Sequence, residues 1–299
     1  PGTTPILVFD CDLAPSVMTK DFKAECPKNF IQCGIQEHST ATTAGAAAAA
    51  GTAAVWADFG VFGIDEVYNQ QRLNDINQSG AKTVLTHVGL DVGEDGKTHQ
   101  CIDYVGLFHN TFGWRLVVPA DPEQTDRVTR WMLGTPDSVC LAMGRSKVDL
   151  VRDPSGCAVF GGSYRFEYGR AVKVRDGKDG AIFALGAMTQ RALAAAAALA
   201  EKNVSAAVWS VSCPLAVDME ALREACGLGC VLTVEDHHAD TGMGSILAVA
   251  MARHGLLAKV RNLGVTRYGD SGPSAAVLAA MGLDEKGIAQ SFLELREGR

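Results

Sequence analysis

The chain has 299 residues, of which 47% are hydrophobic and 20% are charged, and its formal net charge is −7. This balance is typical of a globular protein and excludes disorder over most of the chain. The negative charge argues against a broad surface for nucleic acid or anionic membrane, although it leaves room for a local basic anion pocket. We therefore expect neither nucleic acid nor a membrane among the partners.

Nine cysteines are scattered along the chain, and none forms a C-x-x-C pair. The odd number and the spacing argue against a disulfide framework and against a structural zinc site. We expect small thiols in a reducing, cytoplasmic compartment and no metal-ligand set on this chain. The most apolar window, residues 41–57, consists mainly of Ala, Gly and Thr and ends before Asp58. It favours a packed helix over a membrane span.

Short apolar segments of β type alternate with helix-like segments in the first half of the chain, as in a parallel sheet covered on both faces. The expected strands are residues 6–9, 30–33, 53–56, 83–88, 115–118 and 139–143. The expected helices are residues 37–50, 66–78, 101–110 and 122–133.

A Pro- and Gly-containing segment at residues 153–162 has the composition of a linker, and a second α/β series follows it. The expected strands are residues 171–174, 181–185, 206–209, 231–234 and 259–263, and the expected helices are 189–202, 217–226, 244–254 and 274–281. We therefore predict two consecutive α/β domains with parallel or mixed sheets, at residues 1–155 and 156–299.

Candidate functional groups follow the strands of the first domain, where an open parallel sheet binds its ligands. Acids, imidazoles, two Phe and an Arg lie in residues 10–16, 34–38, 58–62, 87–100 and 144–145. The second domain offers no comparable set, so we expect the site at the carboxyl edge of the first sheet.

The most specific string is Gly-Glu-Asp-Gly-Lys-Thr-His-Gln at residues 93–100. Its Asp95 and His99 can hydrogen-bond a polyhydroxylated substrate and move protons. It lacks the G-K-[ST] ending of a phosphate-binding P-loop and the alternating carboxylates of an EF-hand. The string favours a functional loop over a surface turn.

These segments together resemble the transketolase family. Residues 93–100 resemble its G-E-D-G-P-T-H-Q loop with Lys97 in place of Pro, residues 12–16 its D-L-[TA]-P-S segment, residues 34–38 its G-V-R-E-H segment and residues 59–62 its F-x-x-F segment. His87 lies eight residues before Asp95, as a substrate-binding His does in the family. The segments occur in family order, and Glu235 with residues 241–245 and 267–272 resembles the family's C-terminal domain.

The resemblance covers only the latter part of a full-length transketolase. The family's diphosphate-binding motif, G-D-G followed by a distant N-N, does not occur in this sequence. The resemblance therefore implies thiamine diphosphate as cofactor, with its diphosphate and Mg²⁺ held by a partner. That partner is an N-terminal transketolase subunit, and the expected assembly is α2β2, a split transketolase.

The resemblance also assigns the cofactor-binding and catalytic residues. Glu37 would hydrogen-bond a nitrogen of the cofactor's pyrimidine ring, in an apolar setting. Phe62 would stack on that ring with Phe59 behind it. Asp12 would help to bind the cofactor across a subunit interface. His99 would be a second catalytic residue, transferring a proton to the substrate oxygen.

The substrate assignments rest on the same resemblance. His87, Asp95 and His99 would contact sugar hydroxyls and the carbonyl oxygen, while Arg145 would hold the substrate phosphate with help from Ser16. The family also uses an Arg upstream of the D-L-[TA]-P-S segment, and residues 1–11 contain none. This departure from the family weakens the phosphate assignment unless the partner supplies that group.

The expected reaction is transfer of a two-carbon ketol unit from a ketose phosphate to an aldose phosphate. Deoxyxylulose-phosphate synthases and the β chains of 2-oxo acid dehydrogenases share this domain pair and are alternatives. A non-catalytic partner subunit that keeps the fold is a third alternative, and the presence of Glu37 argues against it.

Overall fold

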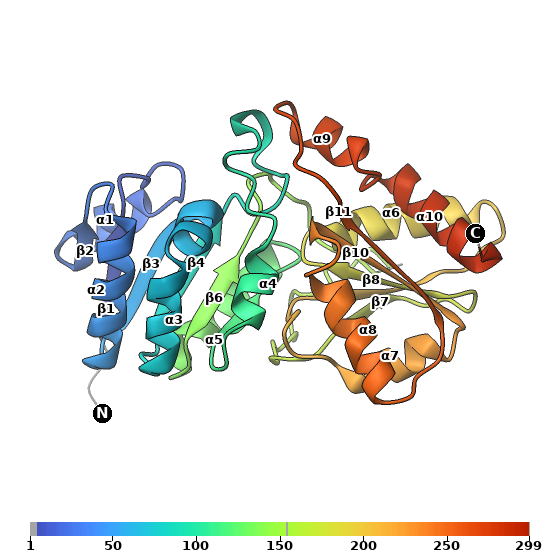
Figure 1. Cartoon of the computed structure of the whole chain (residues 1–299), viewed down its shortest axis with the longest axis horizontal. Helices are drawn as coiled ribbons and strands as arrows, with labels where there is room; N and C mark the ends of the chain where they lie inside the picture. The colour runs from blue at the N-terminus through green and yellow to red at the C-terminus, as the bar shows by residue number, and fades with distance from the viewer. Residues whose placement is uncertain (1–4, 154, 299) are drawn as a thin grey trace.

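Two α/β lobes lie side by side in the computed structural model (Figure 1), which describes residues 5–153 and 155–298. Each lobe is built on one sheet, and the two sheets do not exchange strands. Both expected sheets are therefore present, and the predicted fold class of two α/β domains with parallel and mixed sheets is confirmed.

The first sheet has six parallel strands in the order β2-β1-β3-β4-β6-β5. Its strands are β1 (Ile6–Asp10), β2 (Phe30–Gln32), β3 (Ala53–Phe59), β4 (Lys82–Thr86), β5 (Arg115–Val117) and β6 (Val139–Ala142). Its helices are α1 (Lys20–Glu25), α2 (Glu37–Ala49), α3 (Tyr68–Ile76), α4 (Tyr104–His109) and α5 (Pro122–Gly134), with short helical turns η1 (Pro27–Asn29), η2 (Val61–Glu66) and η3 (Gly93–Asp95).

The second sheet is mixed, with the order β11-β10-β8-β9-β7 and an antiparallel β7 at its edge. Its strands are β7 (Val172–Arg175), β8 (Ala181–Leu185), β9 (Ala207–Val211), β10 (Cys230–His238) and β11 (Lys259–Val265). Its helices are α6 (Met188–Ala200), α7 (Met219–Cys226), α8 (Met243–Arg253), α9 (Ser274–Ala280) and α10 (Glu285–Glu297).

The apolar patterns explain these elements. All five residues of β8 are buried, as a continuous apolar strand covered on both faces requires. In α6, Ala192, Ala195, Ala196 and Leu199 recur at helical spacing and are buried. Alanine has the highest helix propensity, and its small side chain lets α6 approach β9 and α10. The Ala-rich segment is therefore a core helix.

One continuous core crosses the junction between the lobes. It joins Leu85, Phe108 and Trp114 of the first lobe to Phe183 and Trp209 of the second. The Val118 N–H donates to the Ser212 carbonyl at 2.7 Å, and the His238 N–H donates to the Ile102 carbonyl at 2.7 Å. The lobes are therefore packed into one body around the carboxyl edge of the first sheet.

The sequence analysis did not predict α1, α10 or the π-helical turn η2. The α10 helix has a clear start signal in Asp284, whose carboxylate accepts the Gly287 N–H at 2.9 Å. The segment predicted as a linker includes Pro154, which lies outside the described residues; residues 155–162 form turns, and Phe160 is fully buried in the second core. None of the described helices is both long enough and apolar enough to span a membrane.

Candidate active site

Strand order explains why candidate residues far apart in the sequence converge. The neighbouring strands β1, β3, β4 and β6 run parallel, so the loops at their carboxyl ends lie side by side. These loops carry Asp12 and Ser16, Phe59 and Phe62, the segment 87–100, and Arg145, respectively. Glu37 follows β2, the strand next to β1. The sheet therefore brings the predicted residues to one edge.

The loop after β1 is fixed by a buried acid. Asp10 is fully buried, and its Oδ1 accepts the Leu13 N–H at 3.0 Å and the Gln32 Nε2–H at 3.2 Å. Its Oδ2 accepts the Thr19 hydroxyl at 2.7 Å. This loop presents Asp12 and Ser16 to solvent. Among the described contacts, none joins either residue to the other candidate residues.

Glu37 is the first residue of α2, and only 8% of it is exposed. One of its carboxylate oxygens lies within 4.8 Å of both the Cys11 thiol and the Asp58 carboxylate. Among the described residues, none donates a hydrogen bond to the Glu37 carboxylate. The setting is therefore buried, as expected, but it is not apolar, because a second acid lies beside Glu37.

Asp58 is that second acid, and it is fully buried near the end of β3. Its Oδ1 accepts the Phe59 N–H at 2.8 Å, while its Oδ2 has no partner among the described residues. Burial raises the pKa of Asp58 to about 7, opposed by the Phe59 N–H and reinforced by the charge of Glu37. Near neutral pH this pocket therefore holds a proton.

An aromatic row runs from β3 to the segment 87–100. The Phe59 ring stacks on His87 with centroids 3.8 Å apart, and Phe62 lies nearly parallel to Phe59 at 6.1 Å. The rings of Phe62 and His99 meet edge to face, with their centroids 5.5 Å apart. The π-helical turn η2 begins two residues after β3 and contains Phe62, and π-turns of this kind are frequent at functional sites. Phe59 is 9% exposed and Phe62 half-buried, so Phe62 is the ring open to a ligand.

His87 is held in an unusual backbone conformation, with φ of 59°. Its Nδ1 lies 2.9 Å from the Thr86 hydroxyl, and only 7% of the residue is exposed. Burial lowers the pKa of His87, and the positive charge of Arg145 lowers it further. The ring is therefore neutral at pH 7, with one nitrogen able to donate and the other to accept.

The second lobe fixes the segment that carries Asp95 and His99. The Gln100 side chain accepts the Gly269 N–H at 2.9 Å and donates to the Asp270 carbonyl at 3.3 Å. The Ser271 hydroxyl donates to the Glu94 carbonyl at 2.5 Å. In Figure 1 this segment rises above the sheet beside the chain that leads to α9. The C-terminal lobe therefore positions a loop of the N-terminal lobe.

Arg145 follows β6 and reaches the same loop. Its Nη1 donates to the Val92 carbonyl at 3.1 Å and to the Glu94 carboxylate at 3.0 Å. Gly93 beside it has a φ of 68°, a backbone conformation that favours glycine. The Arg145 side chain is 44% exposed, and an exposed ion pair with Glu94 is weak enough to be exchanged for an anionic ligand.

Two clusters of side chains that could act as metal ligands were not predicted from the sequence, because their members are not closely spaced along the chain. Each contains a thiol and two carboxylates within 4.8 Å, and each combines residues from distant segments: Cys11, Glu37 and Asp58, and Asp65, Cys101 and Asp103. The sequence does contain a hint about Asp58, because a charged residue within an apolar strand is rarely buried without a specific role. It contains no such hint about Cys11.

Two further hollows border the lobes. A cavity of about 420 Å³ at the lobe junction is lined by Val61 and Gln100, neighbours of the aromatic row, and by Lys97, Asp103 and Arg267. A groove of about 710 Å³ lies between α4 and α8, and its lining includes Thr241 and Ser245 of the segment 241–245.

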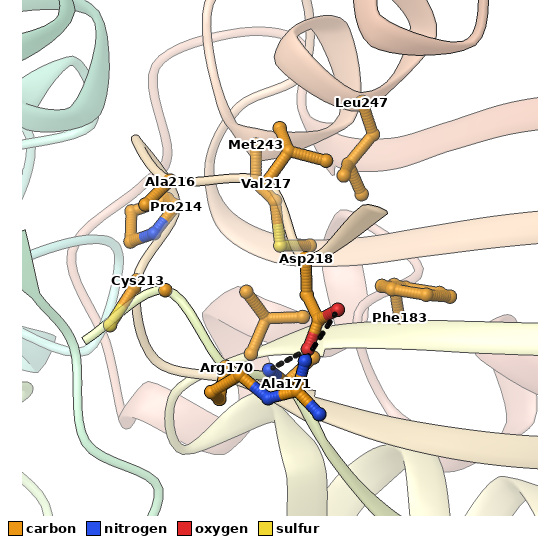
Figure 2. A pocket seen from close by; sticks show the side chains of 12 residues that line it. Arg170, Ala171, Phe183, Cys213, Pro214, Ala216, Val217, Asp218, Met243 and Leu247 are labelled. Atoms are coloured by element: carbon orange, nitrogen blue, oxygen red, sulfur yellow. Dashed lines mark hydrogen bonds and ion pairs between the residues drawn. The ribbon is translucent and has the colours of Figure 1, made fainter. Parts of the chain in front are cut away.

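Figure 2 shows a tighter crevice in the second lobe, with room for about 10 Å³, scarcely one water molecule. The Asp218 carboxylate in it accepts the Ala171 N–H at 3.0 Å and caps α7 through the N–H groups of Glu220 and Ala221. This crevice therefore serves the fold, and we do not assign a ligand to it.

Comparison with known proteins matches both lobes to one family. Residues 3–149 match the transketolase pyrimidine-binding domain, and residues 169–288 match the transketolase C-terminal domain. The chain belongs to the transketolase family. The expectation drawn from residues 12–16, 34–38, 59–62 and 93–100 is thereby confirmed at the level of the family.

Transketolase relatives of similar length support this conclusion. The chain is 28% identical over 291 residues to a transketolase C-terminal section of Methanocaldococcus jannaschii, covering 97% of this chain and 90% of that protein. It is 27% identical to a subunit of the apulose-4-phosphate transketolase of Phocaeicola vulgatus, covering 97% and 91%. A solved structure described as a split-gene transketolase, an inactive β4 tetramer, has a TM-score of 0.87 at 28% identity, covering 98% and 92%.

Proposed function

We propose that this chain is the pyrimidine-side subunit of a two-chain, thiamine diphosphate-dependent transketolase. It would transfer a two-carbon ketol unit from a ketose phosphate to an aldose phosphate. The observation that carries the proposal is Glu37, a buried carboxylate at the start of a helix that accepts no hydrogen bond from the described residues. A buried acid without internal partners is costly unless a ligand supplies them.

The residues present fit an aminopyrimidine ring. Glu37 offers a carboxylate to a ring nitrogen, and the unpartnered Oδ2 of Asp58 adds a second polar atom beside it. Phe62 offers a partly open ring for stacking. When bound, thiamine diphosphate supplies the carbon nucleophile and the electron sink for cleavage of a carbon–carbon bond. Glu37 would hold the proton at the ring nitrogen, and Asp12 would contact the cofactor from its exposed loop.

The segment 87–100 and Arg145 form the proposed sugar-phosphate site. Neutral His87 can both donate to and accept from a hydroxyl, and Asp95 is exposed at the end of η3. His99, at the end of the aromatic row, would move a proton to or from the substrate oxygen. Arg145 would hold the phosphate with paired charge-assisted bonds, with Ser16 as a weaker contributor. The reaction needs a closed site that excludes water and keeps both sugars in position.

The partner would bind the diphosphate and Mg²⁺, since this sequence lacks the family's motif for them. We propose an N-terminal transketolase subunit as partner and an α2β2 assembly. The solved relative described as an inactive assembly of four β chains supports the need for a second kind of chain. The nine free thiols fit a reducing, cytoplasmic compartment.

Reconstitution tests this proposal. The chain is mixed with candidate partner subunits, Mg²⁺ and thiamine diphosphate, and consumption of xylulose 5-phosphate with ribose 5-phosphate is followed. Turnover that requires both chains is expected. Turnover of pyruvate alone would instead point to a decarboxylating relative, and turnover by the chain without a partner would refute the two-chain proposal.

A further inference from the structure

Two fully buried aspartates at the carboxyl edge of the first sheet differ in their partners. Asp10, at the end of β1, has partners at both carboxylate oxygens, namely Leu13, Gln32 and Thr19. Asp58, near the end of the neighbouring β3, accepts one hydrogen bond at Oδ1 and none from the described residues at Oδ2. Asp10 fixes a loop, whereas the Oδ2 of Asp58 is buried without a hydrogen-bond partner among the described residues.

The bare carboxyl belongs to the group that contains Glu37. The elements around Asp58 contribute two titratable groups to this space, Glu37 from α2 and Cys11 from the loop after β1. Burial raises the pKa of the Cys11 thiol to about 12, and the thiol donates to the Thr40 hydroxyl at 3.3 Å. Cys11 therefore stays neutral, and the charge of the group depends on the two acids.

Both acids cannot be charged together without a large cost. Two carboxylates within 4.8 Å repel each other strongly where water is excluded. Glu37 is slightly exposed at 8%, whereas Asp58 is at 0%, so desolvation penalises the charged form of Asp58 more. Of the two acids, Asp58 is therefore the one that burial drives to hold a proton.

We propose that Asp58 is a positioning residue for Glu37: it retains a proton up to the neutral range and directs that O–H toward the neighbouring Glu37 carboxyl. A protonated carboxyl can donate a hydrogen bond, which a charged one cannot. Asp58 thereby leaves Glu37 as the carboxyl group that can share a proton with a ring nitrogen. The inference rests on the proposed function only in naming a ring nitrogen as the ligand of Glu37; the proton on Asp58 does not depend on it.

The first experiment uses the chain alone and does not depend on activity. Infrared spectra of protein labelled with ¹³C-aspartate are recorded from pH 5 to 9 for the wild type and for D58N. Burial also raises the pKa of Asp65 to about 8 and that of Asp236 to about 7, so the difference between the two spectra isolates Asp58.

The difference spectrum should contain the carbonyl band of a protonated aspartic acid that disappears with a midpoint near pH 7. The spectrum of the matched control D10N should still contain this carbonyl band of Asp58. The band should titrate at lower pH in E37Q, where the neighbouring charge is gone.

The second experiment uses the reconstituted complex and compares the pH profiles of kcat. The wild-type profile is expected to bend near pH 7, and the D58N profile is expected to lack that bend. The ratio of the wild-type kcat to the D58N kcat should therefore change about tenfold between pH 6 and 8.5. Asn is neutral at every pH and keeps the shape of protonated Asp58, so D58N should match the wild type best at low pH.

Each outcome decides one claim. A difference spectrum without the band at pH 6 overturns the proton on Asp58. A normal infrared titration with superimposable pH profiles overturns the positioning role. If no partner gives turnover while the band titrates as expected, the proposed function fails and the proton on Asp58 stands.

Discussion

The two lobes place buried acids at the carboxyl edges of their sheets and use them differently. In the second lobe, both oxygens of the fully buried Glu235 are occupied, by the Met243 N–H at 2.6 Å and the Gly244 N–H at 2.8 Å. In the first lobe, Glu37 accepts no hydrogen bond from the described residues and its neighbour Asp58 has a bare oxygen. One lobe thus holds a buried acid that completes a helix, and the other holds a buried acid with an oxygen that has no partner among the described residues.

The histidines show the same contrast. In the second lobe, His237 is fully buried, and its Nε2 accepts the Val105 N–H of α4 at 3.0 Å. Burial lowers the pKa of His237 to about 4, so it remains a neutral acceptor that joins the lobes. In the first lobe, His87 and His99 border an aromatic row rather than a helix end. The proposed site therefore lies where histidines are not used to join elements of the fold.

Glu37 should give the largest effect. E37Q keeps the shape of the side chain but removes the carboxylate from the ring nitrogen, so kcat of the reconstituted complex should fall by about 10²–10⁴-fold, the range for loss of a positioned acid or base. The free energy of unfolding should change little, because no internal hydrogen bond is lost. Steady-state kinetics and urea unfolding measure the two quantities, and unchanged turnover would remove Glu37 from the catalytic machinery.

Asp58 should affect stability in a pH-dependent way. Its pKa is about 7 in the folded chain and near 3.8 when unfolded, so the folded state binds the proton more tightly. Raising the pH from 4 to 7 therefore destabilises the wild type by up to about 4 kcal/mol relative to D58N, and the difference is constant above that. Urea unfolding of both proteins across pH 5–8.5 checks this. A difference that does not vary with pH would contradict it.

Arg145 should separate binding from chemistry. R145A removes the charge-assisted bonds to a substrate phosphate, each worth about 1.5–3 kcal/mol, so KM for phosphorylated sugars should rise roughly tenfold to a hundredfold. KM for unphosphorylated sugars should hardly change, because the Arg145–Glu94 pair is exposed and contributes little to stability. Equal increases for both substrate classes would place the phosphate elsewhere.

The sequence predicted the two α/β domains well because apolar periodicity records burial. The five buried residues of β8 and the Ala stripe of α6 are legible without a structure. It missed α1, which has no buried residue and thus no apolar stripe to read. It missed η2 because a π-turn follows from packing after β3, and not from a local pattern.

The candidate site was predictable where a loop motif carries several groups, as in residues 93–100. It was not predictable where the chemistry depends on a contact between distant segments. Asp58 lies beside Glu37 only because β3 and β2 flank β1 in the sheet. The bare Oδ2 of Asp58 is a property of three-dimensional packing, so no spacing rule could reveal it.

Glu235 provides the smallest expected effect and the matched control for Glu37. Burial raises the pKa of Glu235 to about 8, and the carboxyl still accepts both N–H groups at the start of α8. E235Q puts an amide NH₂ against one of these donors, which should cost about 1–3 kcal/mol of stability and lower Tm by several degrees. The kcat of the reconstituted complex should stay near the wild-type value, since Glu235 touches no proposed ligand. Calorimetry and kinetics on both variants should therefore show that E37Q loses kcat and keeps its Tm, whereas E235Q loses Tm and keeps its kcat. A large loss of kcat in E235Q with unchanged Tm would place a catalytic group in the second lobe.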